Sequence, residues 1–184
     1  MLDEHLGGHN GLTHLDEGAL TWLKQLGHTS FLDIGCGPGG MVELAEQLGF
    51  KVLGVDGDHT LERYKKENFI IHDFQEGPAP VKQFFDIGWS VEFVEHVYEK
   101  YIPNYVKAMQ QCKNVIMTHA VVGQTGYHHV NCQNAPYWIA KMAEYGLILD
   151  EEKTKQLRIA STMGKKKKHK FLEKTGMYFV NENL

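Results

Sequence analysis

A glycine-rich segment is the part of this chain best suited to hold a ligand. Residues 31–40 read FLDIGCGPGG: a short apolar run, an acid and a glycine-rich turn that leads directly into an amphipathic stretch. This order predicts a strand, a tight loop and a helix, with bare backbone at the loop. Because a run of glycines costs backbone entropy, we interpret the loop as a cofactor site rather than as a simple connection.

Three aspartates indicate which cofactor the loop would hold. Asp33 lies two residues before the first glycine, and Asp56 and Asp73 end the next two expected strands. A pyrophosphate would meet the Asp33 carboxylate as a like charge, whereas S-adenosylmethionine has no phosphate and carries a cationic sulfonium and ammonium. Asp56 is placed to accept hydrogen bonds from ribose hydroxyls, and Asp73 suits an adenine amino group. We therefore predict S-adenosylmethionine, with a nicotinamide-dependent oxidoreductase as an alternative because the string also fits GxGxxG.

The apolar periodicity predicts the elements that must position these residues. Short apolar runs predict strands at residues 29–34, 51–55, 69–71, 84–91, 115–118, 147–149 and 177–180. Helical spacing predicts a first helix that is capped by Thr13 or Asp16, and later helices at about 41–48, 61–66, 102–112, 135–142 and 151–162. Strands that alternate with helices predict an α/β fold: a Rossmann-like, doubly wound, mostly parallel seven-stranded sheet with helices on both faces and an antiparallel last strand.

We expect these elements to form one domain over residues 1–184. Residues 1–28 would be an N-terminal cap segment with a helix, and residues 29–184 the core, with the loop 120–134 facing the substrate. The composition is that of a soluble globular protein, with 42% hydrophobic residues and a net charge of −4. Three separated cysteines without a CxxC pair argue against a disulfide framework and a structural zinc site. We expect neither a signal peptide nor a membrane span, and therefore a cytoplasmic protein without a membrane partner.

Four sequence segments resemble motifs I to IV of class I S-adenosylmethionine-dependent methyltransferases. They read LDIGCGPGG, VLGVDGD, HDF and FDIGWSVEFVEH, and the resemblance covers about residues 31–97. The flanking GHNGLTHLDEGAL, GGMVEL and YHHVNCQNAPYWIAKM resemble a methyltransferase-domain subgroup found in bacterial polysaccharide or small-molecule gene neighbourhoods and in bacteriophages. WSVE stands where methyltransferases of exocyclic amines carry Asn/Asp-Pro-Pro-Tyr/Phe, which disfavours a base amino group as acceptor.

The resemblance implies a set of cofactor-binding residues. Asp33, Gly35, Gly37 and Gly39 would line the methionine end, Asp56 would hold the ribose, and Asp73 with Phe74 would frame the adenine. Trp89 and Ser90 would lie near the transferred methyl. Cys36 and Gly57 complete the set of predicted cofactor-binding residues. Cys36 would serve as a small residue that suits the turn. S-adenosylhomocysteine would be the product. His9 and His14 could fold over the cofactor with the N-terminal segment.

Methyl transfer from a sulfonium is an in-line displacement, so the residues around the acceptor decide the substrate. We predict a small-molecule or carbohydrate-like acceptor that is methylated at oxygen, because a hydroxyl needs a general base and histidines gather in these loops. The candidate catalytic residues are His128, His129, Glu92 and His96, and the candidate acceptor-binding residues are His14, His119 and Asn131. Adjacent residues point apart, so one of His128 and His129 should face the acceptor. Glu95 follows the same strand as Glu92 and His96.

Three alternatives remain at the level of the sequence. Glu92, Asp86 and the histidines could hold a divalent cation, but the chain has no HxH or HExxH spacing, so we expect no metal. KKKKHK at Lys165–Lys170 could hold phosphates, which would make the protein a phage-type RNA or DNA methyltransferase. The chain could also be a non-catalytic module that binds S-adenosylmethionine.

Overall fold

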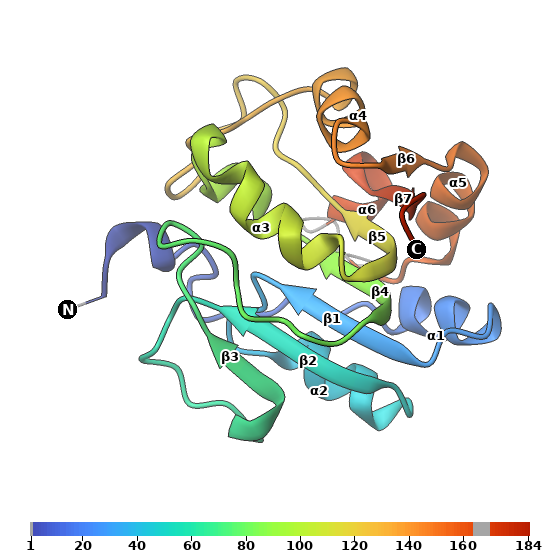
Figure 1. Cartoon of the computed structure of the whole chain (residues 1–184), viewed down its shortest axis with the longest axis horizontal. Coiled ribbons are helices and arrows are strands. Elements are labelled where there is room, and N and C mark those ends of the chain that lie inside the picture. The colour runs from blue at the N-terminus through green and yellow to red at the C-terminus, as the bar shows by residue number, and fades with distance from the viewer. Residues whose placement is uncertain (1, 164–169) are drawn as a thin grey trace.

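The computed structural model describes residues 2–163 and 170–184. Its centre is a seven-stranded sheet in the order β3-β2-β1-β4-β5-β7-β6 (Figure 1). The strands are β1 (Ser30–Ile34), β2 (Lys51–Asp56), β3 (Phe69–Ile71), β4 (Phe85–Ser90), β5 (Cys112–Met117), β6 (Leu147–Leu149) and β7 (Met177–Asn181). The pairs from β3 through β5 are parallel, whereas β7 is antiparallel to both β5 and β6. The prediction of a mostly parallel Rossmann-like sheet with an antiparallel last strand is confirmed.

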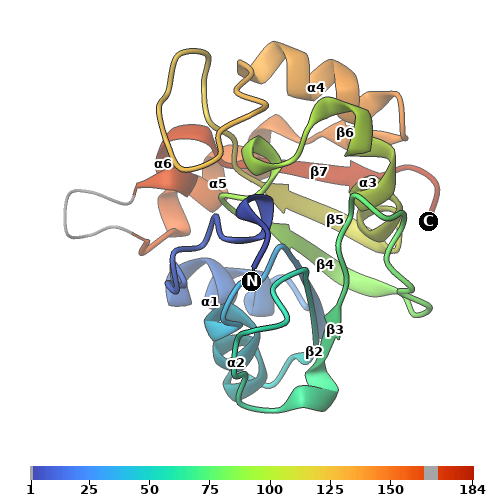
Figure 2. The ribbon, with the colours of Figure 1, turned by 90° about the vertical axis from the view of Figure 1, so that its left-hand side faces the viewer.

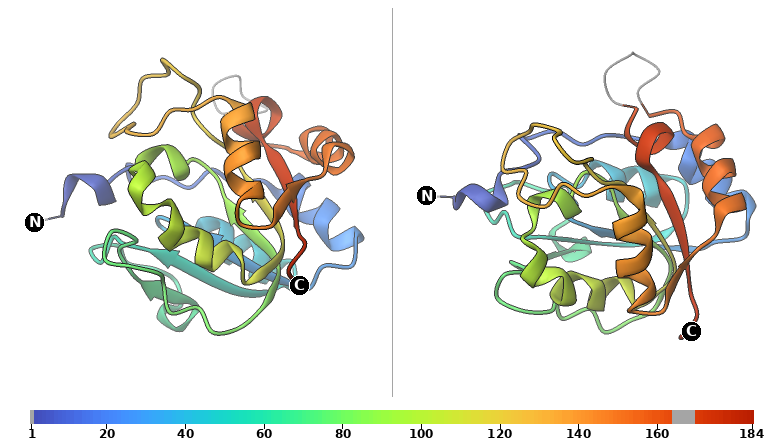
Figure 3. Two further views of the ribbon diagram at one scale, coloured as in Figure 1. Left: turned by 45° about the horizontal axis from the view of Figure 1, so that its top comes forward. Right: turned by 90° about the horizontal axis from the view of Figure 1, so that it is seen from above.

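Helices cover both faces of this sheet (Figure 1 and Figure 3). The α-helices are α1 (Glu17–Gln25), α2 (Gly40–Gln47), α3 (Ile102–Met109), α4 (Ala135–Ala143), α5 (Glu151–Ala160) and α6 (Phe171–Thr175). Short 3-10 turns are η1 (Glu4–Leu6), η2 (Lys66–Asn68), η3 (Val94–His96) and η4 (Glu99–Tyr101). Because neighbouring residues of a strand point to opposite faces, Leu32 packs with α3 and α4 in one core and Phe31 packs with α1, α2, α5 and α6 in the other. None of the helices in the described ranges has the length and apolar character needed to cross a membrane.

The strand order reverses beside β1, which has β2 on one side and β4 on the other. Such a reversal leaves a crevice at the carboxyl ends of the strands, where open α/β sheets bind their ligands. Figure 2 looks onto this edge of the sheet. The N-terminal segment (residues 2–16) crosses in front of the strand ends, and the loop 120–134 lies beside it (Figure 2). The carboxyl ends of the strands are therefore flanked by two largely non-regular segments, residues 2–16 and the loop 120–134.

Several element boundaries differ from the sequence predictions. No α-helix forms at 61–66, because the buried guanidinium of Arg63 donates to the carbonyls of Gly37 and Asp58 and holds this segment against the glycine turn. Cys112 begins β5 instead of ending the preceding helix, which stops at Met109. The first helix is capped by Asp16, which accepts the Ala19 N–H. The helix α6 was not predicted.

Candidate active site

The glycine turn after β1 depends on backbone shapes that side chains resist. Gly35, Gly37 and Gly39 have φ angles of 79°, 51° and 87°. The N–H groups of Gly35 and Cys36 donate to the Val55 carbonyl at 2.8 and 3.1 Å, which fixes the turn to β2. A Cβ atom at Gly35 would lie 2.1 Å from the ring of Phe93, so glycine is required there by space as well as by conformation. The turn therefore forms a cradle, a fixed concave stretch of backbone with few side chains.

Asp33 is a buried acid beside this cradle. Only 4% of its surface is exposed, and burial, together with the Asp56 carboxylate, raises the pKa of Asp33 well above its usual range. A cation next to Asp33 would reverse this shift, because an opposite charge favours the ionised form. The observation fits a positively charged ligand group on the glycine turn, as the sequence predicts for S-adenosylmethionine.

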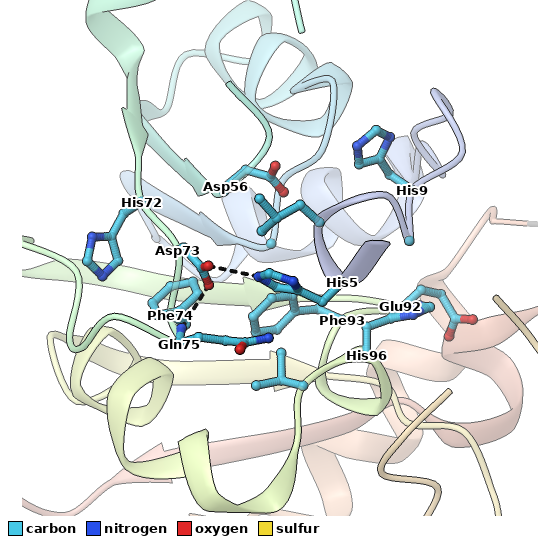
Figure 4. Close-up of a pocket in the computed structure, with 15 residues that line it drawn as sticks. His5, His9, Asp56, His72, Asp73, Phe74, Gln75, Glu92, Phe93 and His96 are labelled. Carbon is cyan, nitrogen blue, oxygen red and sulfur yellow. Dashed lines mark hydrogen bonds and ion pairs between the residues drawn. The ribbon is translucent and has the colours of Figure 1, made fainter. Parts of the chain in front are cut away.

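Two cavities open along the strand ends. The strand-end cavity, about 70 Å³ in volume, lies over β2 and β3 and is lined in part by Asp56, Gly57, Asp73 and Phe74 (Figure 4). The loop cavity, about 340 Å³ in volume, lies between the glycine turn and the loop 120–134. Its walls include Asp33, Gly37, Trp89, His14 and His129. Gly35, Glu92 and His96 line both cavities, so the two spaces meet at the end of β4.

The N-terminal segment forms the outer wall of the strand-end cavity. His5 Nε2 lies 2.8 Å from Asp73 Oδ2, and Figure 4 shows the two side chains reaching toward each other. Leu6 packs over Gly57, where an added Cβ atom would come within 2.3 Å of Leu6 Cδ2. His9 Nε2 lies 3.0 Å from Asp58 Oδ2. Sequence reasoning missed His5 and Leu6, because no local pattern links them to strand ends more than fifty residues away.

Glu92 follows β4 in a strained conformation, with a φ angle of 56°. Its backbone N–H donates to Thr118 Oγ1 at 2.8 Å, and the same hydroxyl donates to Glu92 Oε1 at 3.0 Å. Burial raises the pKa of Glu92 to about 7. A carboxyl group with this pKa, held at the junction of the two cavities, is suited to exchange a proton near neutral pH.

Glu95, His96 and His129 form a second cluster at the same junction. One ligand atom from each of the three side chains lies within 4.8 Å of the other two. Glu95 is fully buried, and burial together with Glu92 raises its pKa well above the usual range. Burial, with a smaller contribution from His129, lowers the pKa of His96 to about 4. The predicted site residues did not include Glu95; its position next to His96 after β4 was the available signal.

Other predicted site residues lie away from the cavities. His128, one of the two histidines predicted to be the base, does not line either cavity; its ring stands edge-on to Tyr98 at 5.7 Å, and Nδ1 is 4.0 Å from Glu4. The buried His119 does not line them either, because its Nδ1 turns toward the Ala120 carbonyl at 3.4 Å.

Asn131, Ser90 and Gly39 also stay outside the cavity walls. Asn131 is buried, and its backbone N–H donates to the Glu95 carbonyl; Ser90 is fully buried; and Gly39 packs against Phe69. Asp86, a candidate metal ligand, lies near the other end of β4 and accepts hydrogen bonds from Thr29 and Lys113. Residues 165–169 of the basic run lie outside the described part of the chain.

The sheet order, the left-handed glycine turn and the buried acid beside it define a class I methyltransferase fold with its cofactor crevice. Residues 32–122 match the family model described as "Methyltransferase domain". Residues 32–122 therefore form a methyltransferase domain, and the solved structures that share its fold are S-adenosylmethionine-dependent methyltransferases. The predictions of enzyme class and cofactor are confirmed.

Solved structures show the same fold at low sequence identity. A TehB-like S-adenosylmethionine-dependent methyltransferase from Corynebacterium glutamicum has a TM-score of 0.64 and 15% identity, over 90% of this chain and 88% of that chain. Magnesium protoporphyrin IX methyltransferase from Synechocystis, solved with bound S-adenosylmethionine, has a TM-score of 0.58 and 14% identity, over 89% of this chain and 75% of that chain. TehB from Haemophilus influenzae has a TM-score of 0.59 and 13% identity, over 96% and 66%. No curated protein matches the sequence.

Proposed function

We propose that this enzyme methylates an oxygen atom of a small-molecule or carbohydrate-like acceptor that binds in the loop cavity. The observation that carries the proposal is the position of this cavity, which shares Gly35 and Glu92 with the strand-end cavity and also contacts Asp33. Its volume of about 340 Å³ lies at the lower end of the roughly 300–1,000 Å³ typical of small-molecule pockets, and part of it borders Asp33, Gly35 and Gly37, where the methionine end of the cofactor would lie. This size favours a compact acceptor.

The residues of the strand ends would hold the cofactor. Asp33 would face the cationic methionine end, Asp56 the ribose, and Asp73 with Phe74 the adenine, with the N-terminal segment covering the adenosine. S-adenosylmethionine supplies an electrophilic methyl group when it is bound. Because the two cavities meet at Gly35, Glu92 and His96, the methyl group would lie at the entrance to the acceptor space.

Glu92 is the general base of this proposal. Its carboxylate is anchored by the Thr118 hydroxyl and lies at the junction where an acceptor oxygen would meet the methyl group. Glu92 would take the proton of the acceptor hydroxyl as the oxygen attacks. His129 also lines the acceptor space, whereas His128 does not, so His129→Ala should lower turnover and His128→Ala should not.

Two measurements test the proposal. Calorimetry should show binding of S-adenosylhomocysteine and none of NAD. Incubation with radiolabelled S-adenosylmethionine and a panel of nucleotide-sugars, phenols, other small alcohols and RNA should label a hydroxyl compound. Labelling of RNA alone would overturn the small-acceptor proposal in favour of the nucleic-acid alternative. Binding of S-adenosylhomocysteine without labelling of any of these compounds would favour the non-catalytic module.

The variant Glu92→Gln, assayed with the compound that the screen identifies as the acceptor, tests the role of Glu92 directly. It should reduce transfer while S-adenosylhomocysteine affinity stays unchanged, because the amide keeps the shape of the side chain and loses its basicity. Thr118→Val, which removes the anchor and leaves the carboxylate, should give a smaller loss. Unchanged transfer in Glu92→Gln would place the base elsewhere.

A further inference from the structure

We propose that Glu95, His96 and His129 bind a divalent transition-metal ion at the wall of the loop cavity. The three side chains come from η3 and from the loop 120–134, and one ligand atom of each lies within 4.8 Å of the others. Two imidazoles and one carboxylate are a common ligand set for zinc and for iron(II), with open positions left for water or substrate. This proposal departs from the sequence expectation that the chain holds no metal.

The first argument is that these side chains lack partners in a buried place. Neither carboxylate oxygen of Glu95 has a hydrogen-bond partner, and neither does Nδ1 of His96. Buried polar atoms are nearly always hydrogen-bonded, and a group of unpartnered atoms on adjacent residues points to a missing ion or water. Among the described residues, Glu95 forms no ion pair that would compensate for the burial of its carboxyl group. A metal ion bound to the Glu95 carboxylate would give this buried group the partner that it lacks.

The second argument is the orientation of His129. Its Nδ1 lies 3.2 Å from the Gln124 carbonyl and 3.6 Å from Cys132 Sγ, and the tautomer that donates to this carbonyl carries its proton on Nδ1. Nε2 therefore keeps its lone pair. Metal-binding histidines characteristically donate their other N–H to a carbonyl or carboxylate in this way. Gly126 packs against the Nε2 edge of this ring, and a Cβ atom at that position would lie 2.2 Å from Nε2.

The third argument is that the backbone holds the two halves of the cluster together. The Glu95 carbonyl accepts the N–H groups of Val130 at 2.9 Å and Asn131 at 3.1 Å. The residue after His129 is thus fixed to the turn that carries Glu95 and His96. The rings of His96 and His129 meet edge to face with their centroids 5.0 Å apart. A closure of the cluster would bring the ligand atoms to the roughly 3.4 Å separation expected around a tetrahedral zinc ion with bonds of about 2.1 Å.

The open side of the site faces the acceptor space, since His96 and His129 both line the loop cavity whereas Glu95 lies behind them. An acceptor hydroxyl bound to the metal would lose its proton more readily, and Glu92 at the same junction could receive that proton. This use of the metal rests on the proposed function. The binding of the metal does not.

The test measures metal binding without any methyl acceptor. Purified chain is stripped with a chelator and titrated with Co²⁺, followed by visible absorption and calorimetry, and zinc content is measured by mass spectrometry after Zn²⁺ loading and desalting. We expect one ion per chain. His129→Ala and Glu95→Gln should weaken Co²⁺ binding at least about tenfold, in line with the loss of a ligand. His59→Gln, at an exposed histidine outside both cavities, is the matched control and should bind as the unmodified chain does.

Two further measurements keep the result unambiguous. Gly126→Ala removes no ligand but displaces the His129 ring, and should also weaken Co²⁺ binding. S-adenosylhomocysteine binding by each variant shows whether that variant is folded. The same measurement on the unmodified chain tests the proposed function. Metal binding without S-adenosylhomocysteine binding would sustain this inference and defeat the proposed function. No stoichiometric Co²⁺ or Zn²⁺ binding, or equal affinity in His129→Ala and the unmodified chain, would overturn the inference and leave a bridging water as the partner of these atoms.

Discussion

The Asp56 carboxylate accepts the Gly37 backbone N–H at 2.8 Å, so the acid that ends β2 also fastens the glycine turn that follows β1. Its other oxygen accepts the Asp58 N–H at 2.8 Å and lies 3.3 Å from the Arg63 guanidinium. Arg63 in turn donates to the Gly37 carbonyl at 2.9 Å. The residue predicted to hold the ribose thus also shapes the cradle for the methionine end.

Asp56→Asn should weaken S-adenosylhomocysteine binding by about tenfold or more and lower the free energy of unfolding by about 1–3 kcal/mol. The amide keeps the size of the side chain but loses the charge that partners Arg63. Calorimetry and denaturant unfolding measure the two effects. Asp150→Asn, at the N-terminus of α5 and outside both cavities, is the control and should leave S-adenosylhomocysteine affinity unchanged. Normal affinity in Asp56→Asn would contradict the ribose assignment.

Gly35→Ala should lower the stability of the fold by far more than the left-handed backbone conformation alone explains. An alanine at this φ angle loses about 1–2 kcal/mol, and its Cβ would also overlap the Phe93 ring. Gly27→Ala is the matched control, because Gly27 has a φ angle of 88° and an added Cβ there meets no atom within 4 Å. Thermal unfolding should show the small loss for Gly27→Ala and a larger one for Gly35→Ala, with cofactor affinity lost in Gly35→Ala alone. Equal losses would mean that Phe93 moves aside freely.

Methyl transfer should increase as the pH rises through about 7. Burial raises the pKa of Glu92 to about 7, and its proposed role requires the carboxylate form. Below this pKa the rate should fall about tenfold per pH unit, and above it the rate should level off. Glu92→Gln should remove this dependence and reduce turnover by about 10²–10⁴. Single-turnover rates with the acceptor found in the screen give the profile; a flat profile between pH 6 and 8 would refute the assignment.

Asp86 should contribute stability that disappears in acid. Partial burial opposes its ionisation, but Lys113 and the N–H and hydroxyl of Thr29 outweigh burial and hold the pKa of Asp86 well below its usual range. A carboxyl group with a lowered folded-state pKa stabilises the fold above its unfolded-state pKa of about 3.9, and this stabilisation is lost as the pH falls below that value.

Asp86→Asn should therefore be less stable than the unmodified chain at pH 7, and the difference should shrink below about pH 4. Urea unfolding between pH 2.5 and 7 measures this difference. Glu67→Gln, at an exposed acid, should show little difference at any pH. A difference that stays constant with pH would mean that shape, rather than charge, holds the Thr29 turn.

Local sequence patterns predicted most of the fold and the donor side of the site. Each strand was visible as an apolar run, and Asp33, Asp56 and Asp73 lie at or just after the ends of such runs. Parallel strands bring their carboxyl ends to one edge, so these acids had to meet without any knowledge of loop conformation. The helix predicted at 61–66 does not form, because the hydrogen bonds of Arg63 to the carbonyls of Gly37 and Asp58 outweigh the local helical pattern.

The acceptor side was decided by the tertiary structure. The choice between His128 and His129 follows from how the loop 120–134 attaches to the Glu95 carbonyl, and the contact of His5 with Asp73 joins residues 68 positions apart. Such contacts depend on side chains that loops bring together, and no periodicity along the chain encodes them. The sequence by itself therefore determined the sheet, the glycine turn and the methyl donor. The packing of the N-terminal segment and of the loop 120–134 over the strand ends determined the cavity walls and the cluster of Glu95, His96 and His129, and the hydrogen bonds with Thr118 determined the position of Glu92.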